Sequence, residues 1–358
     1  MARNRLLWAV IGYLLVRAVG VAVLLVALDG SPSALLHALG DRYDAQWLVG
    51  VAEHGYDDGE TSPSNLAFPL FPFLARVFGV VGLPLGAVLV SWLAGAAAAA
   101  GIYAVGSEVA SRSTAVVLAV LWGVLPHAIT QSMAYTESLF AALAAWSLWA
   151  MLRRRWLTAS LFCALAGLCR ATGWVLVVVL FAVILHHLWR RRDAAWRPWI
   201  ALLIAPCGWF AYVLWVAVRT GDPLGWFAVQ QGWGTRWDGG AFTVQTLYIV
   251  LADGTKLQYV VVALTLLASV ALWCWCLVQR QSWPLLLFSL LVLVTAIGAG
   301  GYFHSKARLI LPAFPLLLPV AAAMVRLPLI LRILAISVLA VLSGAFGAYL
   351  LTLAPYSP

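Results

Sequence analysis

The chain consists of long apolar runs separated by short polar segments. Eleven runs are predicted to cross a membrane, at about 6–28, 84–106, 113–130, 136–152, 156–169, 171–189, 198–218, 257–279, 283–300, 308–325 and 328–353. A helix needs about 20 apolar residues to cross a bilayer, and most of these runs approach or reach that length. Because the runs are continuous rather than alternating, they predict helices and not the strands of a barrel. The pattern therefore predicts an all-α, polytopic transmembrane bundle.

The polar segment 29–83 is predicted to form a long first loop that carries two interfacial helices. Within 41–54, aromatic and apolar side chains recur at the spacing of one helix face, at Tyr43, Trp47, Val51 and His54. Asp44 projects beside this apolar stripe. The run 67–82 is apolar, but it is short and interrupted by two prolines. We therefore expect it to lie in the interface rather than to cross the membrane.

Arginine is concentrated in the loops that this pattern places on one side of the membrane. Those loops hold Arg3, Arg5, Arg112, Arg153, Arg154, Arg155, Arg190, Arg191, Arg192, Arg197, Arg280, Arg326 and Arg332, accompanied only by Glu108 and Asp193. Short cytoplasmic loops are rich in Lys and Arg. This distribution predicts an integral plasma membrane protein with its N-terminus in the cytoplasm, its C-terminus outside and the 29–83 loop outside. If 67–82 crossed the membrane, every later loop would be inverted.

The composition agrees with a membrane protein. Hydrophobic residues make up 64% of the chain and charged residues only 10%, whereas soluble domains have about 25% charged residues. The formal net charge is +9, but the basic residues lie in short loops between spans, so nucleic-acid binding is a poor explanation. No repeat, linker or soluble segment is visible, and we expect one domain over 1–358.

The five cysteines all fall within apolar runs, where small buried side chains are the expected role. Cys274 and Cys276 have the wrong spacing for a zinc or redox pair, and no histidine is near them. The sequence therefore predicts no disulfide, no metal site and no cofactor.

Polar residues gather on the predicted outer face, and they include both carboxylates and cations. The carboxylates are Asp41 and Asp44 in the first loop and Glu137 in a later turn; the cations are Arg170, His304, Lys306 and Arg308. A carboxylate can deprotonate an attacking hydroxyl group, and Lys or Arg can stabilise a leaving phosphate. This combination is suited to transfer from a phosphate-linked donor, and a lipid-anchored donor explains a site at the membrane surface.

Five segments, in order along the chain, resemble one known family. They are 42–47 with 51–56 (R-Y-D-A-Q-W and V-A-E-H-G-Y), 68–72 (F-P-L-F-P), 135–140 (Y-T-E-S-L-F), 169–173 (C-R-A-T-G) and 308–315 (R-L-I-L-P-A-F-P). They resemble the motifs of the PIG-V-like mannosyltransferases, which include the enzyme that adds the second mannose in GPI-anchor synthesis. Tyr43 departs from the tryptophan usual in the first motif, and Trp47 and Leu48 stand where an aromatic pair is frequent.

The resemblance implies a polytopic glycosyltransferase of the GT-C superfamily, with a large outer loop that holds two interfacial helices. Such enzymes use polyprenyl-phosphate sugars, and an aspartate of that loop serves as the base; Asp44 is the matching residue. Arg42, Asp41 and Tyr56 belong to or flank the same motif and are further site candidates. The implied reaction transfers mannose from polyprenyl-phosphate mannose, with inversion, to a lipid-linked or surface glycan. The acceptor remains open.

Each candidate residue can also have a purely structural role. Asp44 can be a solvated helix cap, and we expect Asp41 to be the N-cap of the 41–54 helix rather than a second base. Glu137 can cap the helix that follows it, and Arg170 can extend toward the membrane surface.

For the cluster His304, Lys306 and Arg308, the alternative is contact with lipid headgroups. A different functional class also remains, a transporter or flippase for a lipid-linked glycan. That class requires charged residues in mid-span cavities, whereas the spans of this chain are nearly uncharged.

Overall fold

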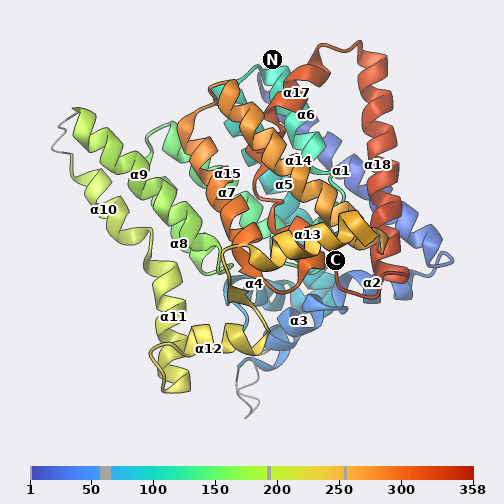
Figure 1. The fold of residues 1–358 in the computed structure, drawn as a ribbon, viewed down its shortest axis with the longest axis horizontal. Helices are drawn as coiled ribbons and strands as arrows, with labels where there is room; N and C mark the ends of the chain where they lie inside the picture. Colours follow the sequence, from blue (N-terminus) through green and yellow to red (C-terminus); the bar gives the residue numbers. More distant parts are fainter. Residues whose placement is uncertain (1, 57–65, 192–194, 254–255) are drawn as a thin grey trace.

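The computed structural model describes residues 2–56, 66–191, 195–253 and 256–358. Within them the chain is helical (Figure 1), apart from one two-stranded ladder, in which β1 (Arg236–Trp237) pairs antiparallel with β2 (Ala299–Gly300). The α-helices are α1 (Ala2–Ala27), α2 (Pro32–Gly40), α3 (Asp44–His54), α4 (Leu70–Phe78), α5 (Leu83–Val109), α6 (Arg112–Trp122), α7 (Glu137–Leu152), α8 (Trp156–Gly167), α9 (Gly173–Arg191), α10 (Trp196–Ile204), α11 (Cys207–Thr220), α12 (Gly225–Gly232), α13 (Ala241–Asp253), α14 (Leu257–Val278), α15 (Trp283–Gly298), α16 (Lys306–Leu309), α17 (Leu318–Val325) and α18 (Leu329–Thr352). Four short 3₁₀ turns join them, namely η2 (Gly79–Val81), η3 (Ala128–Gln131), η4 (Phe303–Ser305) and η5 (Phe314–Leu317).

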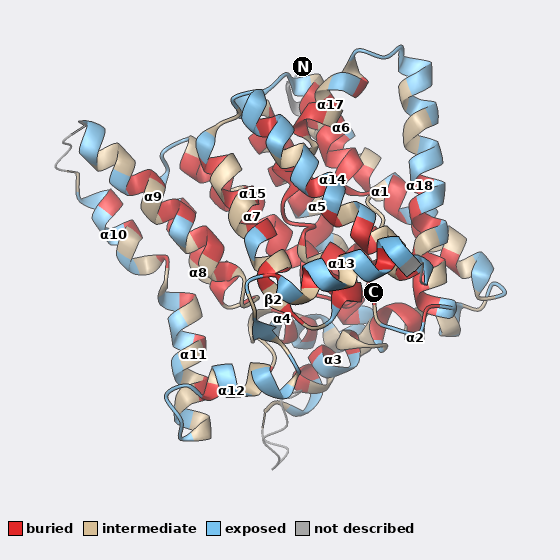
Figure 2. Cartoon of the chain, viewed as in Figure 1, coloured by how far each residue is buried: buried red, intermediate tan, exposed pale blue. Residues whose placement is uncertain are grey.

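Helix α5 lies at the centre of the bundle and packs against α1, α4, α6 and α7. Small side chains make this close packing possible, because helices in a membrane associate through small residues that let their backbones approach. Ala141, Ala144 and Ala145 of α7 are fully buried, as are Ala98 and Ala99 of α5. Figure 2 shows these central helices mainly buried, whereas α18 and α11 at the periphery expose much of their surface.

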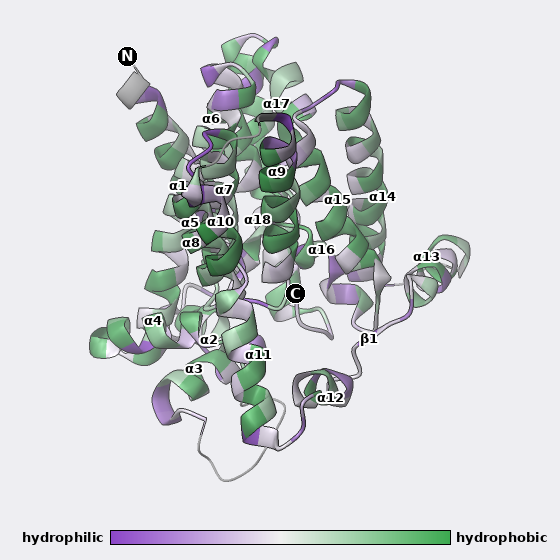
Figure 3. Cartoon of the chain, turned by 90° about the vertical axis from the view of Figure 1, so that its left-hand side faces the viewer, coloured by the Kyte–Doolittle hydropathy of each residue, from purple (hydrophilic) through white to green (hydrophobic). Residues whose placement is uncertain are grey.

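Six helices in the described residues are long and apolar enough to cross a membrane, and they are Asn4–Ala27, Leu83–Val109, Gly173–Arg190, Trp196–Thr220, Leu257–Val278 and Leu329–Thr352. A seventh candidate is the pair Phe303–Leu309 and Phe314–Val325, whose two halves meet at an angle of 76°. The hydrophilic positions lie mostly toward the two ends of the upright helices (Figure 3). The structure therefore confirms a polytopic helical bundle.

The predicted number of eleven spans is not confirmed. The runs predicted at 113–130, 136–152, 156–169 and 283–300 correspond to helices of 11, 16, 12 and 16 residues. These helices are shorter than the roughly 20 residues that cross a bilayer. Hydrophobic length in the sequence overestimates the number of spans because it counts apolar turns and 3₁₀ segments together with the helix.

The first polar segment contains three short helices before α5. The predicted helices in 41–54 and 67–82 correspond to α3 and to α4 with η2, and α2 was not predicted. Helix α4 has only nine residues, too few to cross a bilayer. In Figure 1, α2, α3 and α4 gather at one end of the bundle, and their position in the membrane interface stays a prediction.

Candidate active site

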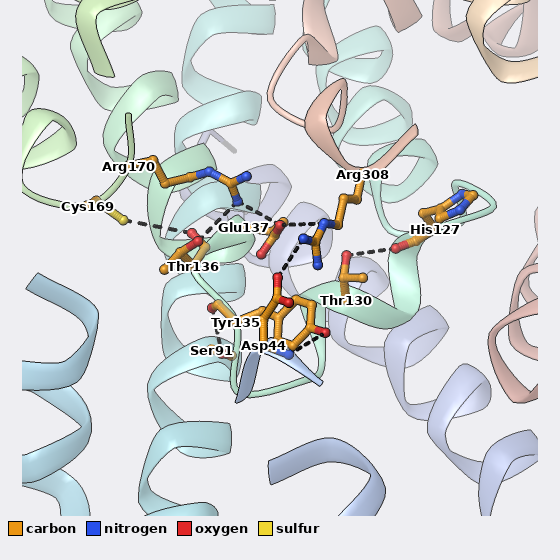
Figure 4. Close-up of polar contacts among 10 residues, drawn as sticks. All are labelled: Asp44, Ser91, His127, Thr130, Tyr135, Thr136, Glu137, Cys169, Arg170 and Arg308. Carbon is orange, nitrogen blue, oxygen red and sulfur yellow. Dashed lines mark hydrogen bonds and ion pairs between the residues drawn. The ribbon is translucent and has the colours of Figure 1, made fainter. Parts of the chain in front are cut away.

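Four charged side chains from distant parts of the chain meet at the end of the bundle where α3 lies. Asp44 begins α3, Glu137 begins α7, Arg170 lies between α8 and α9, and Arg308 belongs to α16 (Figure 4). Arg308 Nη2 lies 2.5 Å from Asp44 Oδ2. Glu137 Oε1 lies 2.6 Å from Arg170 Nη1 and 3.7 Å from Arg308 Nε. We call these four residues the charge cluster; its two carboxylates and two guanidiniums balance.

Asp44 is the exposed member of the charge cluster. Its side chain is 46% exposed, compared with 3% for Glu137 and 13–15% for the two arginines. The turn before it adopts a left-handed conformation at Tyr43 (φ 59°), which ends α2 and starts α3 in a new direction. The backbone N–H of Asp44 donates to Tyr135 Oη at 3.3 Å. The start of α3 is therefore held against the α7 side of the bundle with its carboxylate open to a substrate.

Glu137 is buried in the first turn of α7, where the helix dipole favours a negative charge. The residue that caps this helix is Thr136, not Glu137, and the Thr136 hydroxyl accepts a hydrogen bond from Arg170 at 3.0 Å. Glu137 therefore bridges the two arginines, and one of them, Arg308, lies beside Asp44.

Arg308 is nearly buried, but its hydrogen-bonding capacity is incompletely used. Its Nη2 contacts Asp44, and its Cζ lies 5.2 Å from the ring centroid of Tyr135. Among the described residues, neither Nε nor Nη1 has a hydrogen-bond partner. Burial, followed by the Asp44 charge, raises the pKa of Tyr135 well above its usual value, so this phenol stays neutral. Buried donors without hydrogen-bond partners are rare in proteins. Nε faces Glu137 Oε1 at 3.7 Å, so Nη1 is the donor that has no ion-pair partner among the described residues.

Two other predicted cations point elsewhere. Lys306 is buried, and its ammonium donates to the carbonyls of Ala296, at 2.8 Å, and Ala299 at the end of α15. His304 stacks on Tyr356 with ring centroids 5.0 Å apart. The structure thus separates the three cations of 304–308, and only Arg308 joins the charge cluster.

The remaining motif residues hold the first loop in place. The Arg42 guanidinium donates to the carbonyl of Leu351 in α18. The Tyr56 hydroxyl donates to the carbonyl of Ala67 at 2.6 Å, and Arg219 donates to the Tyr56 carbonyl. These contacts tie both ends of α3 to the rest of the bundle.

The prediction that Asp41 caps the 41–54 helix is wrong. Asp41 is the C-cap residue of α2, its N–H donates to the carbonyl of His37, and its carboxylate lies 3.6 Å from the His37 ring. Helix α3 begins three residues later, with Tyr43 in the N-cap position. The unpredicted helix α2 explains the difference. Asp57, Asp58 and Glu60 of the same loop lie outside the described residues.

Sequence reasoning missed three residues around the charge cluster. Tyr135 and Thr136 contact it directly, and both precede Glu137 in the 135–140 motif, which was the available signal. His127 is fully buried, and neither ring nitrogen has a hydrogen-bond partner among the described residues. No spacing in the sequence singled His127 out.

His127 lines an apolar groove of about 350 Å³. Helix α14 forms one wall and the segment around α16 forms the other, including Ala307 and Ile310 on either side of Arg308. Arg308 itself does not line the groove, so its guanidinium and the groove lie on different faces of α16. Within the described ranges, no group of three or more His, Cys, Asp or Glu side chains is arranged to hold a metal ion, and the predicted absence of a metal stays a prediction.

Comparison with known proteins finds solved structures that share the fold of this chain. No protein-family model matches the sequence, and no curated protein matches it. The apo oligosaccharyltransferase of Archaeoglobus fulgidus superposes with a TM-score of 0.53 at 13% identity, over 94% of this chain and 56% of that one. ArnT from Cupriavidus metallidurans in the apo state superposes with a TM-score of 0.52 at 16% identity, over 88% of this chain and 60% of that one.

The chain has the GT-C fold. It spans only 56–60% of the length of these two GT-C structures. At this level of identity the likeness concerns the fold alone. The finer resemblance to the PIG-V-like branch rests on the five sequence segments and stays a prediction.

Proposed function

We propose that this protein is an integral membrane glycosyltransferase that uses a polyprenyl-phosphate sugar. The observation that carries the proposal is the contact between Asp44 and Arg308 at 2.5 Å. It joins a half-exposed carboxylate to a buried guanidinium whose Nη1 has no hydrogen-bond or ion-pair partner among the described residues. A base for a hydroxyl group and a binding group for a leaving phosphate thus lie side by side, on a fold shared with glycosyltransferases.

The proposed reaction is a single displacement at the anomeric carbon. The acceptor hydroxyl oxygen attacks that carbon and forms the new glycosidic bond. The bond from the anomeric carbon to the phosphate oxygen breaks, and its electron pair leaves with the phosphate. Asp44 accepts the hydroxyl proton, and Nη1 of Arg308 binds the phosphate through a charge-assisted hydrogen bond. One displacement inverts the anomeric centre.

The apolar groove on the other face of α16 is the proposed site for the aliphatic chain of the donor. The groove is almost entirely apolar, and Ala307 and Ile310 of its wall are neighbours of Arg308 in the sequence. A donor with its phosphate on Arg308 must therefore pass its chain around α16 to reach the groove. Burial of that chain stabilises binding by about 0.8 kcal/mol for each buried methylene group.

The choice of mannose rests on the resemblance of the five segments to the PIG-V-like mannosyltransferases. The proposed acceptor is a glycan or glycolipid hydroxyl. The proposed location is the outer face of the plasma membrane, because the arginine-rich loops 153–155 and 190–192 are assigned to the opposite side.

The transporter alternative is weaker. It requires charged groups in a cavity near the middle of the membrane. Arg17 of α1 is a buried mid-helix cation, but its guanidinium donates to the Ser132 hydroxyl at 3.0–3.1 Å and the Gly123 carbonyl at 3.0 Å. These contacts occupy donors of the guanidinium and join α1 to the segment before α7, which indicates a structural role for Arg17.

The test incubates purified protein with polyprenyl-phosphate mannose and a lipid extract from the native membrane, and detects products by mass spectrometry. We expect a mannosylated product and free polyprenyl phosphate in equal amounts. Polyprenyl-phosphate glucose and GDP-mannose serve as parallel donors. Transfer from polyprenyl-phosphate glucose alone would show that the transferred sugar is glucose rather than mannose, and it would leave the proposed mechanism unchanged. Transfer only from GDP-mannose would refute the lipid-linked donor.

A further inference from the structure

A second pocket, of about 550 Å³, lies between the ends of α7 and α9 and the beginnings of α8 and α15. These helices are neighbours in the bundle. Its lining includes Arg154, Trp156, His186, His187, Arg190 and Trp283. Helix α7 runs from the charge cluster at Glu137 to this pocket, and its 16 residues correspond to about 24 Å. The pocket is therefore separate from the candidate active site.

The lining is basic and contains no carboxylate. Two guanidiniums, of Arg154 and Arg190, and two imidazoles face the pocket. In the described part of the chain, neither guanidinium has a hydrogen-bond or ion-pair partner. Their neighbours differ, since Arg153 pairs with Glu108 at 3.4 Å and Arg155 lies 4.9 Å from the Trp149 ring. The unpaired cations are thus the ones that border the pocket.

Helix α15 strengthens the preference for an anion. It begins at Trp283 on the pocket wall, and its N-cap residue Ser282 makes no side-chain capping bond. A helix N-terminus carries a partial positive charge that favours an anion. Pro284 has no N–H, and the N–H groups of Leu285 and Leu286 donate to the Ser282 carbonyl, so the N–H of Trp283 remains for a phosphate oxygen. The indoles of Trp283 and Trp156 also hold the two imidazoles, with centroids 5.4 Å apart for His186 and 5.1 Å for His187.

We propose that this pocket binds the phosphate-bearing headgroup of an anionic membrane lipid. Leu185 and Trp189 of α9 and Trp283 of α15 are exposed apolar side chains at this end of the bundle, so the acyl chains of a lipid have a surface to lie on. The headgroup supplies a negative counter-charge for Arg154, Arg190 and the start of α15. Basic pockets between transmembrane helices are a known way of recognising anionic headgroups. The site serves to anchor the ends of α7, α8, α9 and α15, and it is independent of the proposed transfer reaction.

The experiment titrates purified protein in neutral detergent with short-chain phosphatidylglycerol. Binding is followed by native mass spectrometry and by the midpoint of thermal unfolding. Phosphatidylcholine with the same chains is the headgroup control, and inorganic phosphate is the soluble arm. We expect saturable binding of phosphatidylglycerol with a higher unfolding midpoint, and little effect of the other two compounds.

The decisive variant is Arg154→Asn combined with Arg190→Gln. Asn is chosen because Arg154 has a left-handed backbone (φ 55°), which Asn tolerates better than most residues. A charge near the membrane surface contributes about 1 kcal/mol to lipid binding, so affinity should fall about fivefold for each arginine, or roughly 25-fold for both. The matched control Arg155→Gln removes one positive charge from the same end of the bundle and should leave affinity unchanged.

Folding of each variant is checked by its elution and unfolding midpoint without added lipid, and Arg190→Gln alone provides a milder variant. A loss of about fivefold in Arg155→Gln, equal per removed charge to the loss in the double variant, would show diffuse surface attraction and refute the pocket. Unchanged affinity in the folded double variant would also refute it. If inorganic phosphate displaces phosphatidylglycerol at equal concentration, the ligand of the pocket is a soluble anion and the lipid proposal is refuted. None of these readouts measures transfer, so a negative result leaves the proposed function untouched.

Discussion

Asp44 is the half-exposed carboxylate of the charge cluster, and its proposed role as base gives the first prediction. Asp44→Asn keeps the size of the side chain and one hydrogen bond to Arg308, but the amide cannot accept the proton. General-base catalysis contributes about 10²–10⁴-fold, so kcat should fall by at least about 100-fold. The control is Asp41→Asn, because Asp41 caps the end of α2 and only faces His37; its kcat should stay within about twofold of wild type. Initial rates with polyprenyl-phosphate mannose decide the comparison, and near wild-type transfer by folded Asp44→Asn would remove the base from the mechanism.

Glu137 gives the second prediction, which concerns stability. Glu137→Gln leaves Arg170 and Arg308 without their shared counter-charge in a site where Glu137 is only 3% exposed. Removal of one partner from a buried ion pair costs about 3–5 kcal/mol, so the unfolding midpoint in detergent should fall clearly.

The matched control for Glu137→Gln is Glu108→Gln. Glu108 also pairs with an arginine, Arg153, but at 28% and 51% exposure. An exposed pair contributes about 0–1 kcal/mol, so this midpoint should barely change. Equal shifts in the two variants would mean that the charge cluster is solvated and does not hold the helices together.

The sequence predicted the residue types of the site better than their pairings. It identified Asp44, Glu137, Arg170 and Arg308 as candidates, because charges are conspicuous in a chain that is 64% hydrophobic. It also grouped Lys306 with Arg308. Both lie in α16, and residues two apart on a helix point about 200° away from each other. Lys306 therefore reaches the end of α15. The packing that turns Arg308 rather than Lys306 toward Asp44 cannot be read from the sequence.

At the scale of helices, close packing of α11 on α8 gives the third prediction. A Cβ atom on Gly208 would lie 1.8 Å from the carbonyl oxygen of Ala164, so Gly208→Ala must push the two helices apart. We expect a lower unfolding midpoint, by an amount typical of overpacking, about 1–3 kcal/mol or more. Gly50→Ala in α3 is the control, because a Cβ there meets nothing within 4 Å and Ala favours a helix by about 0.5–1 kcal/mol. The control should be neutral or stabilising, and a similar loss in both variants would contradict the packing of α11.

Hydropathy predicted where helices occur but not where they break. The long helices α1, α5, α14 and α18 lie within a few residues of their predicted runs. The run 308–325 instead divides into α16, η5 and α17, and the two halves of this region meet at 76°. Pro312 lies in the break, and proline cannot donate the backbone hydrogen bond that continues a helix. A hydropathy pattern treats proline like its apolar neighbours, so it did not predict the bend that brings Arg308 to Asp44.

At the scale of the whole molecule, two kinds of charge lie at opposite ends of the bundle. The charge cluster lies where α7 begins, and the basic pocket lies where α7 ends. The 16 residues of α7 separate them by about 24 Å, somewhat less than the roughly 30 Å of a bilayer core, so in an upright bundle the two sites lie toward opposite faces of the membrane. The proposed donor site and the proposed headgroup site then contact different leaflets, and neither competes with the other for lipid.

This separation gives the last prediction, which concerns topology. In a variant without native cysteines, Ser33→Cys at the start of α2 should react with a membrane-impermeant maleimide in intact cells, because Ser33 is exposed at the end that holds the charge cluster. Arg155→Cys, exposed after α7, should react only after permeabilisation, since arginine-rich loops stay in the cytoplasm. Labelling of Arg155→Cys alone in intact cells would show that the protein has the opposite orientation in the membrane, with transfer on the cytoplasmic face. Labelling of both in intact cells would mean that α7 does not separate the two faces, and the charge cluster and the basic pocket would then share one leaflet.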